Sequence, residues 1–484
     1  MLRALVGIGL VQVVTMALYL VRTKGLALLL GPEQIGIMGV IDKAVALVVQ
    51  TMSLSLPFAA VRFLPAAWEA GPEQWTTLYR QMRLVLLALV LPAAIAALVV
   101  AIVAPHWWGN ELAGYGPVLG AAAATIPALA LVPFLQNAVA GRLQQYRAML
   151  VSLGHAAVSA VAVIGAWWWG LRGFYLVLAL LGTGLAAPLA WWLGRRHSGP
   201  APTKGDPALA GLPRRVWRFS GTMFLLAVTV PYAALFVHYT VLRHQAALGA
   251  GWMQAALGIA LAVRVALGAA HGVFLTPNIN RGGPPEERMR WADGFQETFC
   301  RLVLLVVPPL LLFPGLAVRV LYSSAFLPGA PFVALFVTAE ILGLLAGTYQ
   351  SLIVALDHLR FHVVQNLVAQ GVVVGLAVWL VAPLGLLGAG LAWLGAPVLM
   401  LATTVIFLRR AHGLRVGARA QRLGVGLAAA MIVAGLVGTL TAVTSPVGIL
   451  LRGVVLGGVL TSTIRGMTTE EWGRVRALVP GWGR

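Results

Sequence analysis

Apolar runs of about 20 residues recur along the whole chain, separated by short segments rich in Gly, Pro and Arg. A helical run of this length matches the thickness of a bilayer's hydrocarbon core, whereas a transmembrane β-barrel would show short segments of alternating hydrophobicity. The pattern predicts an all-α polytopic membrane protein. Run length and loop position predict about fourteen transmembrane helices, at residues 5–30, 35–63, 82–104, 117–139, 148–169, 173–193, 217–242, 249–276, 299–318, 331–356, 361–382, 386–408, 424–443 and 446–464.

The longest polar stretch, residues 194–216, follows six predicted helices and precedes six more, so it is expected to be a cytoplasmic linker. Six is an even number, so the two six-helix lobes enter the membrane in the same sense, as in transporters built from parallel repeats. A Leu-Gly pair opens the turn into the second helix of each half. The expected domains are a first lobe, the linker, a second lobe, two additional transmembrane helices and an amphipathic cytoplasmic tail, at residues 1–193, 194–216, 217–408, 409–464 and 465–484.

The composition agrees with a membrane protein and gives an orientation. The chain is 60% hydrophobic and 10% charged, with 34 Lys and Arg against 14 Asp and Glu and a net charge of +20. Most of the basic residues outside the predicted helices lie in alternate loops, as cytoplasmic loops of membrane proteins do. We therefore place both termini in the cytoplasm. The sequence holds no nucleic-acid-binding motif, so the charge does not indicate a nucleic-acid partner.

The sequence lacks the motifs of common enzyme classes. It has no Gly-x-x-x-x-Gly-Lys-Ser/Thr phosphate loop, no His-Glu-x-x-His and no Gly-x-Ser-x-Gly. Its nine histidines show no metal spacing, and a single cysteine, Cys300, excludes an intramolecular disulfide. We predict that the chain is not an enzyme, with no catalytic residue, no metal site and no cofactor beyond an Na⁺ or H⁺ coupling ion.

Charge inside the first predicted helix points to a binding site. Arg22 and Lys24 lie in an otherwise apolar run, and ionisable groups in a membrane span usually face a bundle interior or a water-filled cavity. Gln12, Thr15 and Tyr19 recur with Arg22 at helical spacing, so these four residues share one face. Lys24 lies roughly 160° away around the helix.

Later spans carry polar residues of the same kind, each with a purely structural alternative. Asp42 and Lys43 could pair and fix helix packing, Glu340 could hydrogen-bond locally, and His271 could be a packed histidine. Taken together the intramembrane charges are cationic, which favours an anion such as phosphate or pyrophosphate. The candidate substrate-binding residues are Gln12, Tyr19, Arg22, Lys24, Lys43, Tyr232, Arg264 and His271, and the candidate ion-coupling residues are Asp42 and Glu340.

Residues 22–43, which read RTKGLALLLGPEQIGIMGVIDK, resemble the opening of polysaccharide-biosynthesis flippases of the Wzx type. That family belongs to the superfamily (MOP) that also holds the MATE exporters and the lipid II flippase MurJ. The resemblance implies two six-helix lobes around a central cavity and alternating access. It implies transport of an undecaprenyl-pyrophosphate-linked oligosaccharide, such as an O-antigen unit, to the outer leaflet of the bacterial cytoplasmic (inner) membrane. Arg22 matches the family's cationic first helix.

The two helices after the twelfth resemble those of MurJ, where the extra pair forms a lipid-tail groove. Membrane lipids are expected partners, together with polysaccharide polymerases and glycosyltransferases. Two other transport functions stay open at this point: a MATE-type ion-coupled antiporter for drugs or metabolites, and a lipid II flippase. A drug antiporter calls for unpaired carboxylates. A scaffold or a glycan polymerase is a further alternative, but no predicted outer loop is long enough for a polymerase.

Overall fold

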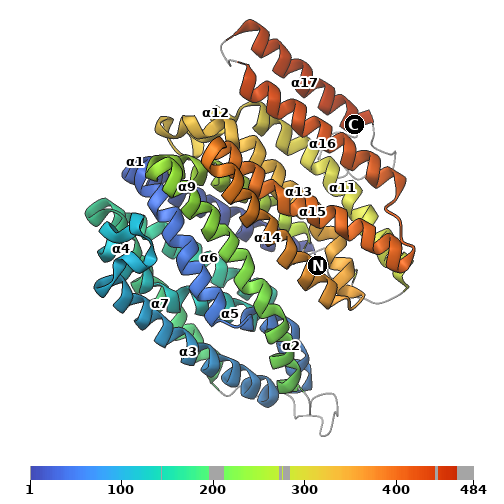
Figure 1. Cartoon of the computed structure of the whole chain (residues 1–484). Helices are drawn as coiled ribbons and strands as arrows, with labels where there is room; N and C mark the ends of the chain where they lie inside the picture. The colour runs from blue at the N-terminus through green and yellow to red at the C-terminus, as the bar shows by residue number, and fades with distance from the viewer. Residues whose placement is uncertain are drawn as a thin grey trace. The chain divides into compact units, whose positions relative to one another are not determined.

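The computed structural model describes residues 2–142, 144–195, 212–271, 275, 279, 284–441 and 445–465, and these residues form helices and short connections without a β-strand (Figure 1). Most of the predicted linker and of the predicted tail lies outside the described residues. The α-helices are α1 Leu2–Met52, α2 Leu56–Ala70, α3 Pro72–Val103, α4 Gly116–Ala123, α5 Ile126–Ala140, α6 Gln145–Val161, α7 Val163–Gly194, α9 Leu212–Ala270, α11 Pro285–Leu312, α12 Pro314–Leu321, α13 Val333–Ala355, α14 Leu359–Leu384, α15 Leu386–His412, α16 Ala418–Leu440 and α17 Pro446–Arg465. The 3₁₀ helices are η1 Pro105–Trp108, η2 Asn110–Tyr115 and η4 Ser324–Phe332.

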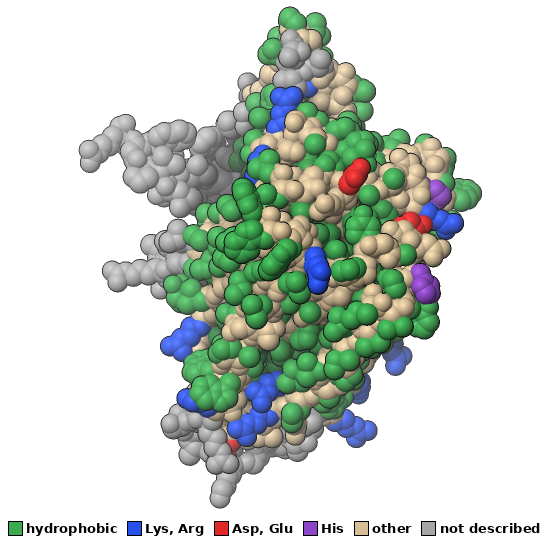
Figure 2. Space-filling view, turned by 90° about the vertical axis from the view of Figure 1, so that its left-hand side faces the viewer, with side chains coloured by type: hydrophobic (Ala, Val, Ile, Leu, Met, Phe, Trp, Pro, Cys, Tyr) green, Lys and Arg blue, Asp and Glu red, His purple; other side chains and the backbone are tan. Residues whose placement is uncertain are grey.

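Ten helices among the described residues are long and apolar enough to cross a membrane, which confirms the all-α polytopic prediction. Three helical elements contain sharp breaks, at Gly31 in α1, at Trp169 and Gly170 in α7, and at Ala246 in α9. Gly31 has φ 71° and ψ 179°, and Ala246 has φ 54° and ψ −176°. With these breaks, each of the 14 predicted spans corresponds to a helical segment within the described residues. Hydrophobic side chains far outnumber charged ones on the face drawn in Figure 2, as a lipid-facing surface requires.

The second predicted span, 35–63, is broken in the structure and not continuous. Leu54 and Ser55 adopt positive φ of 46° and 57°, and α2 begins at Leu56. Pro57 is the physical reason, because it has no N–H to donate to the carbonyl of Ser53 and its ring crowds that carbonyl.

The chain divides into two compact units, of which the first comprises Met1–Ala255, Val320–Phe326 and Val363–Ala396. Inside it, the segment of α1 after Gly31 crosses the segment of α9 after Ala246 at van der Waals distance. A Cβ built on Gly36 would overlap the carbonyl oxygen of Ala247, and a Cβ built on Gly251 would overlap that of Pro32. The contact is reciprocal. Gly36 lies one helical turn after Pro32 on α1, and Gly251 lies one helical turn after Ala247 on α9.

This reciprocity is the pattern that two related halves would produce, and it supports the predicted parallel repeat. It also changes the alignment of the halves. The sequence pattern pairs Gly31 with Gly249, whereas the structure places the equivalent break at Ala246, three residues earlier.

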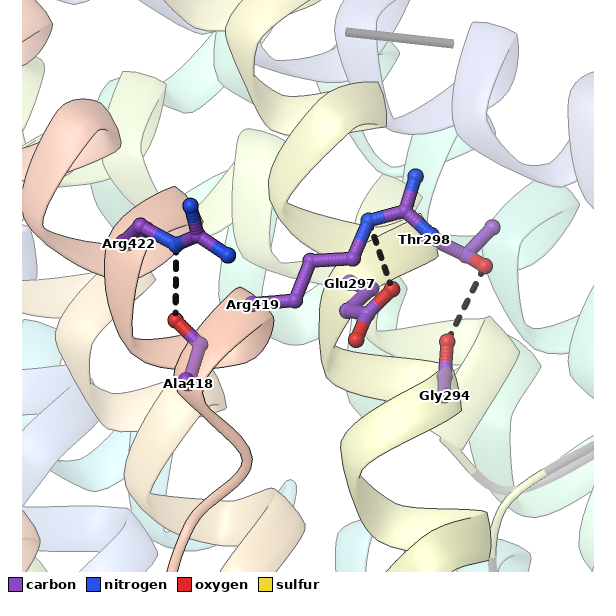
Figure 3. Close-up of polar contacts among 6 residues, drawn as sticks. All are labelled: Gly294, Glu297, Thr298, Ala418, Arg419 and Arg422. Atoms are coloured by element: carbon purple, nitrogen blue, oxygen red, sulfur yellow. Dashed lines mark hydrogen bonds and ion pairs between the residues drawn. The ribbon is translucent and has the colours of Figure 1, made fainter. Parts of the chain in front are cut away.

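The second unit comprises Ala256–Arg319, Leu327–His362 and Pro397–Arg484. In it α16 packs along α11, and one of the polar contacts drawn in Figure 3 links the two helices. Arg419 of α16 forms an ion pair of 3.4 Å with Glu297 of α11. The backbone N–H of Gly417, which precedes α16, donates to Oδ2 of Asp293 at 3.0 Å, and Tyr349 donates to Oδ1 of the same carboxylate at 3.0 Å. Asp293 therefore caps α16 from a neighbouring helix.

Arg452 of α17 is buried, with 1% of its surface exposed. Its Nε donates to the carbonyl of Leu312 at 2.8 Å and its Nη2 to that of Thr441 at 2.7 Å. These carbonyls end α11 and α16, where helices leave acceptors unpaired and the helix dipole favours a cation. Arg452 thus joins the ends of α11 and α16 to α17, and the last pair of helices is fastened to α11.

Candidate functional site

A cavity of about 340 Å³ lies inside the first unit, between the two halves of α1 and the helices α5, α6 and α7. Polar side chains from three of these helices face it. Its lining residues are Tyr19, Arg22, Asp42, Val45, Ala46, Val49, Gln50, Leu129, His155, Ser159, Tyr175 and Leu178.

The predicted polar face of the first helix is turned inward. Tyr19 and Arg22 line the cavity, and Thr15 is buried and donates to the carbonyl of Val11 at 2.8 Å. The valines of the opposite face are exposed, Val13 at 66% and Val21 at 62%. The helical spacing of polar residues therefore identified the buried side of this helix correctly.

Arg22 presents its guanidinium to the cavity. Its Cζ lies 5.2 Å from the centroid of the Phe174 ring, and its Nε is buried without a hydrogen-bond partner among the described residues. An arginine carries five N–H donors and stays charged. A buried donor of this kind costs free energy as long as it has no acceptor.

Asp42 reaches the same cavity from the second half of α1, because the break at Gly31 folds that half beside the first. Tyr175 of α7 donates to Oδ1 of Asp42 at 2.7 Å. The described residues contain no ion pair between Asp42 and Arg22. The cavity therefore combines one guanidinium and one carboxylate, and it is less cationic than the sequence predicts.

The sequence analysis missed three polar residues of this cavity: His155, Ser159 and Tyr175. His155 and Ser159 are four residues apart on α6 and so share one helix face. The buried Nδ1 of His155 has no hydrogen-bond partner among the described residues. The same search for a polar helix face, applied to the fifth predicted span, would have found the pair.

Other predicted site residues of the first unit lie outside the lining of this cavity. Lys24 donates from Nζ to the carbonyl oxygen of Tyr322. Gln12 and Lys43 are partly buried on α1. Tyr232 of α9 is 48% exposed, and its ring centroid lies 6.3 Å from that of Phe236.

The second unit holds the remaining predicted site residues in paired arrangements. Arg264 of α9 forms an ion pair of 2.7 Å with Glu340 of α13, with side-chain exposures of 53% and 4%. His271 has its Nε2 3.0 Å from both the carbonyl of Leu344 and the Oγ1 of Thr348. Arg264 thus pairs with Glu340, although the sequence analysis gave the two residues different roles. His271 has the packed, hydrogen-bonded environment that the sequence analysis gave as the structural alternative to a binding role.

Solved structures share this architecture, although no protein-family profile and no curated sequence matches the chain. MurJ, described as a lipid II flippase in an inward closed conformation, aligns over 96% of this chain and 99% of its own, with a TM-score of 0.60 and 11% identity.

The chain has the MATE/MurJ fold. An inward-facing multidrug resistance MATE transporter of the MOP superfamily aligns over 84% of this chain and 95% of its own, with a TM-score of 0.56 and 15% identity. The MATE multidrug transporter DinF-BH aligns over 86% and 96%, with a TM-score of 0.53 and 17% identity. These likenesses confirm the predicted MATE/MurJ-like architecture. At such identities they concern the fold alone.

Proposed function

We propose that this protein is a flippase that moves an undecaprenyl-pyrophosphate-linked oligosaccharide from the inner to the outer leaflet of the bacterial cytoplasmic membrane. It works by alternating access, without enzymatic chemistry, and both of its termini lie in the cytoplasm. Glycosyltransferases would supply its substrate on one side and a polysaccharide polymerase would consume it on the other.

The observation that carries the proposal is the environment of Arg22. A charged guanidinium with a buried, unsatisfied Nε lines a cavity at membrane depth. Pyrophosphate supplies oxygens in the geometry that a guanidinium binds with two parallel hydrogen bonds. In this proposal Arg22 contacts the pyrophosphate, and Tyr19 and Gln50 flank it in the same cavity.

The extent of the structural matches supports a flippase over a drug exporter. The MATE structures leave 14–16% of this chain unaligned, whereas MurJ leaves 4%. The segment from the start of α16 to the end of the chain has about that length. An additional helix pair offers apolar surface to a long polyprenyl tail, as Leu440 and Val447 do with exposures of 78% and 65%.

Asp42 is the residue that favours the alternative, a MATE-type ion-coupled antiporter. It places a carboxylate in the cavity beside Tyr175. We assign it to coupling, in which Na⁺ or H⁺ neutralises the carboxylate so that the cavity accepts an anion. The same carboxylate would bind a cationic drug directly, so the two functions predict opposite effects of its removal. A lipid II flippase is a third function, which shares the pyrophosphate contact and differs only in the glycan.

Reconstituted vesicles separate these functions. The purified chain is inserted into liposomes containing a fluorescent undecaprenyl-pyrophosphate oligosaccharide, and outer-leaflet label is quenched or digested at intervals. A flippase makes the inner-leaflet pool accessible. Failure to move this lipid or lipid II, with uptake or release of an organic cation such as rhodamine under an ion gradient, would establish the antiporter instead.

A further inference from the structure

A group of arginines in the first unit lies outside the Arg22 cavity, where the start of α3 meets the C-terminal end of α7. A pocket of about 350 Å³ is lined there by Arg80, Arg83, Trp191, Gly194 and Arg195. We refer to it as the arginine pocket. None of these lining residues is acidic. The positive-inside rule places this end of both helices at the cytoplasmic surface.

The arginines are held in place by the C-terminal end of α7. Arg80 donates to the carbonyl of Gly194 at 2.7 Å, and Arg83 donates from Nη1 to that of Ala190 at 2.8 Å. The guanidinium carbon of Arg195 lies 3.4 Å from the ring centroid of Trp191. The Arg83 guanidinium packs closely on Gly194, because a Cβ built on that glycine would lie 2.9 Å from Nη1 of Arg83.

A fourth arginine stands directly behind the pocket. Arg142 donates to the carbonyl of Leu193 at 3.1 Å, and its guanidinium carbon lies 3.8 Å from the ring centroid of Trp75. Burial lowers the pKa of Arg142 to about 10, so its guanidinium is still charged at neutral pH. Its charge adds to the positive potential of the pocket.

Capping of α7 explains only part of this arrangement. A helix C-terminus carries about half a negative charge, whereas Arg80 and Arg83 alone bring two positive charges to it. Arg80 uses one donor on a carbonyl, and Arg83 donates to one carbonyl and has a hydrogen bond with the Tyr79 side chain. The buried Nε of Arg83 has no partner among the described residues. The excess of charge and of N–H donors calls for an anion.

An apolar track leads from the pocket along the outer face of α3. The exposed residues of that face recur at helical spacing from Arg80 onward and share one side of the helix. They are Leu84, Leu91, Ile95, Leu98 and Ile102, with exposures of 62, 44, 61, 36 and 70%. The opposite face, with Met82, Leu86 and Val90, is buried. A ligand with a phosphate at Arg80 and a long acyl chain would lie along this track.

We propose that the arginine pocket binds the headgroup of an anionic phospholipid, whose acyl chain packs on the exposed face of α3. Trp191, which is 61% exposed, lies where tryptophan favours the membrane interface. Basic pockets between transmembrane helices on the cytoplasmic side are suited to such headgroups. The site is separate from the Arg22 cavity and does not depend on the transported substrate.

Native mass spectrometry of the purified full chain tests the proposal. The protein is equilibrated with equal amounts of phosphatidylglycerol and phosphatidylethanolamine, and bound lipids are counted. The wild type should retain phosphatidylglycerol preferentially, and salt should weaken the preference. Each arginine near the surface contributes about 5-fold, so Arg80→Gln with Arg83→Gln should lower the affinity for phosphatidylglycerol by roughly 30-fold.

The matched control is Arg147→Gln. Arg147 is exposed and is predicted to lie on the same, cytoplasmic side of the membrane as the arginine pocket. It donates to the Gln144 side chain, outside the pocket. It should leave the preference unchanged. If the double variant does not fold, Arg80→Gln and Arg195→Gln are measured singly, each with an expected loss of about 5-fold.

Two results would overturn the proposal. One is a folded double variant that retains phosphatidylglycerol as the wild type does. The other is a combined result, in which inorganic pyrophosphate displaces the lipid at an equal concentration and dihexanoyl and dioleoyl phosphatidylglycerol bind equally well. The pocket would then recognise a soluble anion, and the apolar face of α3 would contribute nothing to binding. Both readouts are independent of flipping, so they separate this site from the proposed function.

Discussion

Replacing Arg22 by alanine should abolish most transport while leaving the protein folded. Arg22 lines the cavity, has a buried Nε without a hydrogen-bond partner among the described residues, and forms no ion pair there whose loss would leave a carboxylate stranded. The substitution therefore removes the proposed ligand contact, and the structural contact that it removes is that with the Phe174 ring, 5.2 Å away.

The magnitude follows from one charge-assisted hydrogen bond. Such a bond contributes about 1.5–3 kcal/mol, which corresponds to a loss of roughly 10- to 150-fold in substrate binding. The assay is the rate at which labelled lipid-linked oligosaccharide becomes accessible in reconstituted vesicles, at substrate concentrations below saturation. Expression and thermal unfolding of the variant should stay close to the wild type, because the cation–π interaction between Arg22 and Phe174 contributes only about 0.5–1 kcal/mol.

Two variants bracket this result. Arg22→Lys keeps the charge but loses the planar pair of donors, so it should recover only part of the activity. Arg172→Ala removes an exposed arginine from the segment that follows the break in α7 and should be nearly silent. Wild-type transport by Arg22→Ala would refute the reasoning, since Arg22 would then be a packing residue and the cavity would not bind the pyrophosphate.

Further predictions concern the folded state. Arg264→Ala should lower the thermal stability by about 1–3 kcal/mol, because it removes the ion pair with the buried Glu340 carboxylate, and adding Glu340→Gln should restore part of the loss; single effects that simply add in the thermal unfolding cycle would exclude coupling. Gly36→Val should block correct folding, as judged by size-exclusion chromatography, because the carbonyl of Ala247 leaves no space for a side chain, and a monodisperse variant would contradict the described helix crossing. Arg452→Met should destabilise the second unit by about 1–3 kcal/mol by leaving helix-end carbonyls unpaired, and an unchanged melting temperature would show that those carbonyls find other partners.

Local pattern identified part of the candidate site and missed part of it. Tyr19, Arg22 and Asp42 all line the cavity, and their polarity in apolar runs marked them. Tyr175 was missed because one polar residue in an apolar span looks ordinary until a neighbour is known, whereas a search for a polar face on the fifth predicted span would have found His155. Arg452 shows that a charge within a predicted span does not always mark a binding site. Its guanidinium caps helix ends instead.

The sequence by itself determined the class of the protein, the place of each helical segment and the buried face of the first helix. Those properties follow from run length and helical periodicity, which are local quantities. Only the tertiary structure decided which charges meet. The break at Gly31 brings Asp42 to the cavity of Arg22, and the packing of α9 against α13 gives Arg264 its partner Glu340. The net charge of a cavity depends on such long-range pairings, which residue spacing along the chain does not encode.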